Sequence, residues 1–132
     1  MTSDLKNPEI QEIRKAVQVY LDGIAQCNYD KISQVFHPKA QIFALSQEKL
    51  RILPATAWKD YCEKTDPSNQ KFSAEIVSID NVGTAAAVKV LINVEGPNGI
   101  FDFTDFYNLL KLDNKWKVMN KTFHSDIKMA KT

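Results

Sequence analysis

The C-terminal third of the chain constrains the fold most, because two long runs with strand-like composition are joined by a very short turn. The first run spans residues 100–112 and the second spans residues 115–124. Asp113 and Asn114 join them, and both residue types tolerate the positive φ angles that tight hairpin turns require. We therefore expect a long β-hairpin, one face of which can form the wall of a pocket.

The register of this hairpin decides which side chains face the interior, because a shift of one residue moves every side chain of a strand to the other face. A two-residue loop would place Lys111 opposite Trp116. A longer loop with a bulged turn residue would instead place Leu110 opposite Trp116, and Asn108 opposite Val118. We predict the second register, because it buries no lysine.

In this register the predicted inner face is apolar near the turn and becomes polar farther along the hairpin. The remaining inward pairs are Phe106 with Asn120, Thr104 with Thr122, and Asp102 with His124. The outer face collects four lysines, namely Lys111, Lys115, Lys117 and Lys121. Asp105 lies opposite Lys121 on that face, and opposite charges across a ladder are favourable. We interpret these two residues as a structural pair.

Length and charge exclude several classes of protein. A chain of 132 residues is sufficient for one domain, which we expect to span residues 1–132 with short tails at about 1–7 and 125–132. The net charge of +1 gives no field that would attract nucleic acid. No apolar run approaches the roughly 18 residues that a membrane span needs.

The same sequence suggests a reducing compartment. The N-terminus lacks the charged and then apolar layout of a signal peptide. Cys27 and Cys62 lie far apart and form no CxxC pair, so they are expected to be small buried thiols. We therefore expect a cytoplasmic protein.

The rest of the chain alternates helical and strand patterns. Asn7, Pro8 and Glu9 read as the cap and first turn of a helix that continues to about Asn28. A short helix over 30–36 ends before Pro38. Strands are expected at 40–45, 49–53, 72–80 and 84–95, with a further helix that Thr56 caps before the second pair. This order indicates an α+β fold in which helices cover one face of a curved antiparallel sheet.

Two segments carry a family resemblance. Phe36-His37-Pro38-x-Ala40 follows the helical pair, and the closing segment over 109–121 reads LLKLDNKWKVMNK. With the order of elements, they resemble the NTF2-like (SnoaL-like) superfamily, and within it the branch described as "Putative lumazine-binding", over residues of about 9–124. The resemblance implies a cone-shaped α+β barrel with about three helices, and a homodimer formed through the outer face of the sheet.

The predicted outer face agrees with a dimer. It mixes lysines with five large apolar side chains, namely Phe103, Tyr107, Leu109, Met119 and Phe123. Apolar patches of this kind often mark interfaces.

Enzymes of the superfamily place an Asp or His deep in the cone as a general base, and the resemblance therefore directs attention to His124. Asp102 lies opposite it in the predicted register and could fix the imidazole tautomer. The simpler interpretation is a surface histidine near the C-terminus. His37 either contacts a ligand or, in the simpler interpretation, caps a helix end or bonds to backbone.

Two further groups of residues could line the cone. Asn108, Asn120, Thr104 and Thr122 would form a polar floor, although such side chains can also satisfy one another across the ladder. The aromatic side chains Tyr20, Phe43, Trp58, Phe106 and Trp116 are expected in the core, and any that line a cavity would favour a flat, ring-bearing ligand.

The first functional hypothesis is a dimeric cone-fold protein that binds a small, partly aromatic molecule. The alternatives are an isomerase, hydratase or cyclase with a His or Asp base, and a protein-interaction scaffold. The sequence contains no glycine-rich phosphate loop and no GxSxG motif. Its two separated histidines also argue against a metal site, and no cofactor is expected.

Overall fold

The computed structural model describes residues 7–130. These residues form ten elements in the order α1 (Pro8–Gln26), α2 (Tyr29–Ser33), β1 (Phe36–Ser46), β2 (Lys49–Pro54), α3 (Ala57–Lys64), the 3₁₀ helix η2 (Pro67–Asn69), β3 (Lys71–Val82), β4 (Ala85–Gly96), β5 (Gly99–Leu112) and β6 (Lys115–Ala130). The predicted order of helices and strands is therefore confirmed. β6 continues to Ala130, so most of the segment expected as a C-terminal tail is strand.

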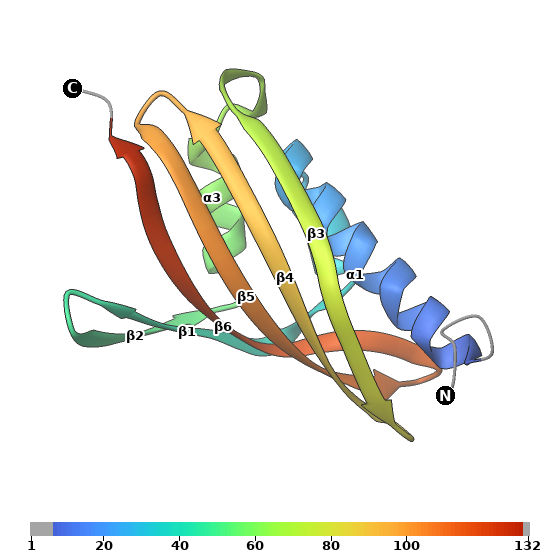
Figure 1. Cartoon of the computed structure of the whole chain (residues 1–132). Coiled ribbons are helices and arrows are strands. Elements are labelled where there is room, and N and C mark those ends of the chain that lie inside the picture. The colour runs from blue at the N-terminus through green and yellow to red at the C-terminus, as the bar shows by residue number, and fades with distance from the viewer. Residues whose placement is uncertain (1–6, 131–132) are drawn as a thin grey trace.

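The six strands form one curved sheet in the order β2-β1-β6-β5-β4-β3. Neighbouring strands are antiparallel except for β1 and β6, which pair in parallel. Figure 1 shows that the sheet stays open and that α1 and α3 lie on the same side of it. This arrangement confirms the expected α+β fold, in which helices cover one face of a curved sheet. None of the helices within residues 7–130 is long and apolar enough to cross a bilayer.

The first helix begins and packs as its sequence predicts. The Asn7 side chain accepts a hydrogen bond from the backbone N–H of Glu9 at 3.0 Å, and Pro8 occupies the first turn. The apolar stripe from Ile10 to Ile24 is buried against the sheet. Two local predictions are wrong: the Thr56 side chain makes no cap hydrogen bond to α3, and β1 already includes His37 and Pro38.

The turn between β5 and β6 has two residues rather than the longer loop that we predicted. Asp113 and Asn114 have φ angles of 49° and 67°, and Lys111 lies opposite Trp116. The ladder is then interrupted: Leu109 pairs with Val118, but Asn108 pairs with Asn120, which leaves Met119 as an extra residue in β6. The predicted register is therefore wrong.

The bulge at Met119 changes which side chains of β6 face the helices, because an extra residue shifts the alternation of faces. Trp116 and Val118 face inward, as predicted, and both are buried. Beyond the bulge, Lys121 and Phe123 face inward instead of outward. The residues that move to the outer face are Asn120, Thr122 and His124.

The faces of β5 are reversed relative to the prediction along the whole strand. Phe103, Asp105, Tyr107 and Leu109 face the helices, and the last three are each only 1% exposed. The predicted inner residues of β5, which are Asp102, Thr104, Phe106, Asn108 and Leu110, share the outer face.

Candidate functional site

A cavity of about 260 Å³ lies between α1, α3 and the inner face of the sheet. Its wall is mostly apolar. It is lined by Ile24, Ile42, Leu53, Ala57, Trp58, Tyr61, Phe72, Ile92, Val94, Phe103, Asp105, Lys121 and Phe123. Asp105 and Lys121 are the two charged residues of this lining, and they come from the adjacent strands β5 and β6.

Asp105 is held in place through one of its two carboxylate oxygens. Its Oδ2 accepts a hydrogen bond from the Tyr107 hydroxyl at 2.8 Å and lies 3.4 Å from the Lys121 Nζ. Its Oδ1 is buried and has no hydrogen-bond partner within the described chain. A buried carboxylate oxygen without a partner is costly, so this atom is a candidate contact for a ligand or for a proton in transfer.

Lys121 sits in an aromatic part of the wall. Its Nζ lies 4.6 Å from the centroid of the Trp58 ring and 5.1 Å from that of the Phe123 ring, both within cation–π range. Burial lowers the pKa of the Lys121 ammonium because a charge is poorly solvated there, and the nearby Asp105 carboxylate opposes this shift. The amine is therefore easier to deprotonate than a surface lysine.

Neutral hydrogen-bond donors lie behind this pair. The Tyr20 ring packs against Tyr107 and Trp58 with centroids 5.2 and 5.8 Å apart. Burial, with a contribution from the Asp105 charge, raises the pKa of both tyrosines well above the usual value of 10.0, so both phenols keep their protons. The Tyr20 hydroxyl and the Trp58 indole N–H are buried and have no hydrogen-bond partner among the described residues.

The arrangement can therefore polarise an oxygen and move a proton. An ammonium group and a carboxylate lie side by side in apolar surroundings, where electrostatic interactions are stronger than in water. Carbonyl oxygens suit the ammonium and the neutral donors, and the unpaired carboxylate oxygen can accept a proton.

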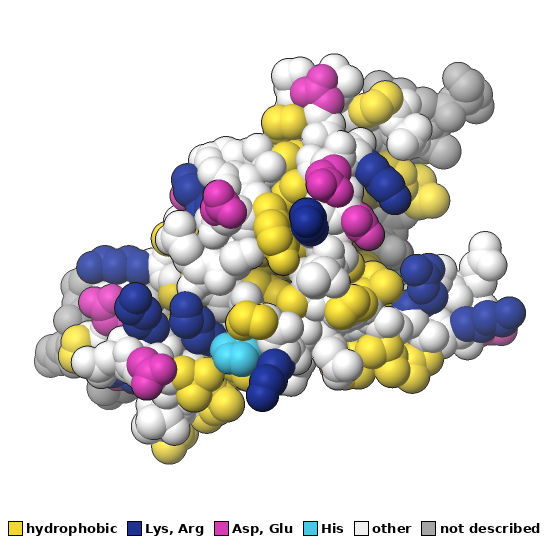
Figure 2. All heavy atoms as spheres, turned by 180° about the vertical axis from the view of Figure 1, so that it is seen from behind, with side chains coloured by type: hydrophobic (Ala, Val, Ile, Leu, Met, Phe, Trp, Pro, Cys, Tyr) yellow, Lys and Arg dark blue, Asp and Glu magenta, His cyan; other side chains and the backbone are white. Residues whose placement is uncertain are grey.

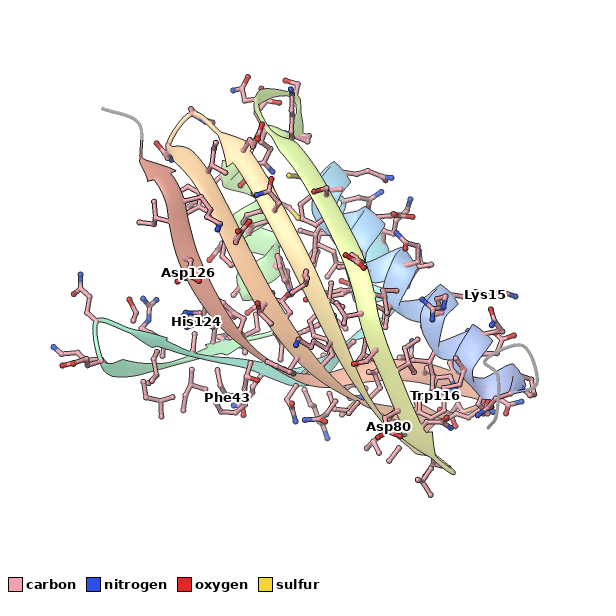
Figure 3. All side chains as sticks on the ribbon, viewed as in Figure 1. Lys15, Phe43, Asp80, Trp116, His124 and Asp126 are labelled. Atoms are coloured by element: carbon pink, nitrogen blue, oxygen red, sulfur yellow. The ribbon has the colours of Figure 1, made fainter. Side chains whose placement is uncertain are left out.

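The predicted catalytic pair does not form. His124 is exposed on the outer face, and its Nε2 lies 3.2 Å from Asp126 Oδ1. Figure 3 shows both side chains on the same stretch of β6. Asp102 lies opposite Asp126 in the ladder and accepts a hydrogen bond from Asn93 at 2.7 Å. The predicted pairing of Asp102 with His124 is therefore wrong, because the two-residue turn and the bulge at Met119 each shift β6 by one residue relative to the predicted register.

His37 does not line the cavity either. It is half-buried in β1, and its Nδ1 accepts a hydrogen bond from the backbone N–H of Lys39 at 3.0 Å. This contact matches the alternative in which the imidazole bonds to backbone.

One of the nine predicted ligand-binding residues, Trp58, lines the cavity, and Tyr20 lies directly behind it. The Asn108 side chain donates to Asn120 at 2.9 Å, so these amides satisfy each other across the outer ladder. The other residues of the predicted lining that lie on the outer face are Phe43, Thr104, Phe106 and Thr122.

Trp116 is buried at a different place, beside the start of α1, with its indole N–H 3.5 Å from Glu9 Oε1 (Figure 3). It borders an open groove with several lysines, and Figure 2 shows Lys and Arg side chains gathered at this end of the molecule. Lys111 in this groove lies 2.8 Å from the Glu9 carboxylate, and Lys117 donates to the Gln34 carbonyl at 2.6 Å. Lys111 and Lys117 are therefore already paired with groups of the protein, and we assign the groove no role.

The predicted dimer surface was also placed on the wrong face. Phe103 and Phe123 line the cavity, with ring centroids 6.0 Å apart. Tyr107 and Leu109 are in the core, and Met119 is half-buried at the bulge. Lys121 and Asp105 do lie close together, as predicted, but inside the molecule. Their opposite charges were the one signal in the sequence that could have identified the site.

Comparison with known proteins places the chain in a family. A family described as "Putative lumazine-binding" matches residues 8–124. The chain belongs to this family.

Residues 7–130 contain no cluster of three or more His, Cys, Asp or Glu side chains that could hold a metal ion.

The chain is similar to a protein named as an aldolase and to solved NTF2-like structures. It is 23% identical over 125 residues to Aldolase FrzH of Cladobotryum sp, with 95% of this chain and 98% of the relative covered. Its fold matches the crystal structure of an NTF2-like protein from Shewanella baltica OS155 with a TM-score of 0.78 and 29% identity, over 96% and 98% of the two chains. An NTF2-like protein from Methylobacillus flagellatus KT matches with a TM-score of 0.74 and 30% identity, over 91% and 94%.

Proposed function

We propose that this protein binds a small molecule in the cavity, with an apolar ring against the aromatic wall and a polar oxygen at Lys121, beside Asp105. The observation that carries this proposal is the buried Asp105 Oδ1, which has no partner within the described chain although it belongs to a cavity wall. An unsatisfied buried acceptor costs about 1–3 kcal/mol, so this oxygen favours an acidic C–H group of a ligand whose carbonyl oxygen accepts from Lys121.

The cavity wall favours a particular class of ligand. Its volume of about 260 Å³ is slightly below the roughly 300–1,000 Å³ of sites for drug-sized ligands, which suits a molecule of one or two rings. The family description supports binding of a small molecule. A pteridine, however, carries hydrogen-bonding atoms around most of its edge, and most of this wall could not satisfy them. We therefore propose a largely apolar carbonyl compound.

This proposal predicts selective stabilisation by a ring ketone. We expect 1-indanone to raise the melting temperature, whereas indane, which lacks the oxygen, and lumazine should raise it much less. At a ligand concentration 100-fold above the Kd, stabilisation of about 2.7 kcal/mol is expected. Differential scanning fluorimetry measures the shift.

A cavity-filling variant provides the control. Val94→Phe places a larger side chain in the wall, so it should abolish the shift while the variant still unfolds cooperatively. If no ring ketone stabilises the protein, or if Val94→Phe binds 1-indanone as well as the parent does, the cavity is not the binding site.

A second candidate function, removal of a proton next to a carbonyl group, is favoured by one specific arrangement. The carboxylate of Asp105 has one oxygen without a partner, and an ammonium that can stabilise an enolate lies 3.4 Å from the other oxygen. The similar Aldolase FrzH carries the name of a reaction class that proceeds through such carbanions. We propose Asp105 as the base.

We also propose that two copies associate through the outer face of the sheet. This face exposes Leu91, Phe106 and Leu110 on β4 and β5, at 42%, 48% and 40%. It carries charges of both signs, with Lys89 and Glu75 among them, so two copies can meet without net repulsion. A second copy of the chain is therefore a suitable partner for this surface.

Replacing Phe106 with Lys tests the proposed dimer. The parent should elute at twice the mass of the chain in size-exclusion chromatography with light scattering, and Phe106→Lys should shift it to the monomer because a charge is buried without a partner. Lys15→Ala, on the exposed side of α1, is the matched control and should stay dimeric. A monomeric parent at micromolar concentration would contradict the proposal.

A further inference from the structure

We propose that Lys121 forms an imine with the carbonyl group of the molecule bound in the cavity. This inference rests on the proposed function, because it requires a carbonyl compound beside Asp105. It adds a covalent step that binding or simple proton abstraction does not need.

The position of the amine supports this role. Lys121 is 7% exposed, and its Nζ lies over the Trp58 ring in the wall of a cavity large enough for a ligand. Most lysines keep their ammonium in water, because burying it is costly. A desolvated lysine in a hydrophobic pocket is the arrangement that activates an amine as a nucleophile.

A purely structural ion pair would have a different environment. In such a pair both groups are enclosed and their remaining hydrogen-bonding atoms are satisfied by the protein. Here both residues belong to the cavity wall, and the Asp105 Oδ1 has no protein partner. Both groups therefore border the cavity, and the Lys121 side chain, 9% exposed against 1% for Asp105, is the one that a molecule there meets first.

The neutral amine arises within the pair. The Lys121 Nζ lies 3.4 Å from the Asp105 Oδ2, so a small approach of the two groups brings them within the range of direct proton transfer. Burial lowers the pKa of Lys121 and so favours this transfer. The Tyr107 hydroxyl donates to the same oxygen at 2.8 Å and keeps the carboxyl group oriented.

The covalent step balances with these two residues alone. The Lys121 nitrogen forms a bond to the carbonyl carbon while one amine proton moves to the carbonyl oxygen, which gives a carbinolamine. The proton held by Asp105 then joins that hydroxyl group, the C–O bond breaks, and water leaves. The products are a protonated imine on Lys121, the Asp105 carboxylate and one water molecule, so the net charge of the pair is unchanged.

The regenerated carboxylate is then placed for a second proton transfer. An imine with a positive charge acidifies the neighbouring C–H group more than a neutral ketone does. Asp105 can accept that proton through the oxygen without a protein partner, and the bonding electrons form the C=C bond of an enamine. The two residues thus account for both steps.

Reductive trapping tests the proposal. The full-length protein is incubated at neutral pH with 3-phenylpropanal and sodium cyanoborohydride, and the modified lysines are identified by peptide mass spectrometry. We expect Lys121 to gain the mass of the aldehyde less one oxygen atom at least ten times faster than any other lysine. Lys121→Arg keeps the charge and should lose this fast phase.

The outcomes separate this inference from the proposed function. The alcohol 3-phenylpropan-1-ol cannot form an imine but should still raise the melting temperature. If it does so while Lys121 is modified no faster than surface lysines, the imine is wrong and the binding function stands. If neither compound stabilises or modifies the protein, both proposals fail. Fast labelling that persists in Lys121→Arg would place the reaction at another lysine and also overturn the inference.

Discussion

Replacing Asp105 with Asn is expected to slow hydrogen–deuterium exchange at the α-carbon of 1-indanone by about 10²–10⁴-fold relative to the parent protein. Asparagine has nearly the same shape, but its amide cannot accept a proton at neutral pH. The exchange is measured in D₂O from the loss of the α-proton signal by NMR, after subtraction of the rate without protein.

A second carboxylate on the sheet gives the matched control for this variant. Asp80 is exposed on β3 (Figure 3), so Asp80→Asn should exchange at the parental rate. The assignment of Asp105 would be contradicted if Asp105→Asn kept the parental rate. It would also be contradicted if His124→Ala abolished exchange, since His124 lies on the opposite face of the sheet.

Replacing Lys121 with Met should lower the free energy of unfolding by about 3–5 kcal/mol, because it leaves the Asp105 carboxylate buried without its cation. Lys128→Met is the control: Lys128 also pairs with an aspartate, Asp102, at 3.6 Å, but its side chain is 62% exposed. Loss of such a surface pair should cost at most about 1 kcal/mol. Urea unfolding followed by circular dichroism measures both values.

The double variant distinguishes loss of a charge partner from loss of packing. Asp105→Leu with Lys121→Met removes both charges and fills similar space, so it should regain most of the stability that the single Lys121 variant loses. If the single variant is as stable as Lys128→Met, the pair is not buried in the way that the structure indicates.

The sequence predicted the elements and the fold because local signals specify them. Asn7 and Pro8 mark the start of α1, and the apolar stripe that follows matches the helical period. Asp113 and Asn114 mark the hairpin turn, and both adopt positive φ angles. These features depend on neighbours in the chain, so they can be recognised without the tertiary structure.

The faces of the hairpin could not be predicted in the same way. The bulge at Met119 has no distinctive residue to mark it, and it reverses the faces of the following positions of β6 as far as Ile127. We also rejected any register that buried a lysine, since lysine is normally exposed. That rule fails at Lys121 because Asp105 and the aromatic rings of Trp58 and Phe123 surround its amine.

This failure coincides with the candidate site. A lysine inside an apolar wall costs stability, and sequences tend to depart from such rules where function requires it. The same bulge that misled the prediction is what brings Lys121 to the cavity. The local irregularity of β6 and the proposed chemistry therefore have a common structural origin.

A crystal structure of the protein soaked with 1-indanone tests the central claim most directly. We expect the ketone ring against Trp58 and Phe123, with its oxygen at hydrogen-bonding distance, about 3 Å, from the Lys121 amine. A ketone bound on the outer face beside His124, or a Lys121 side chain that extends into solvent, would contradict it.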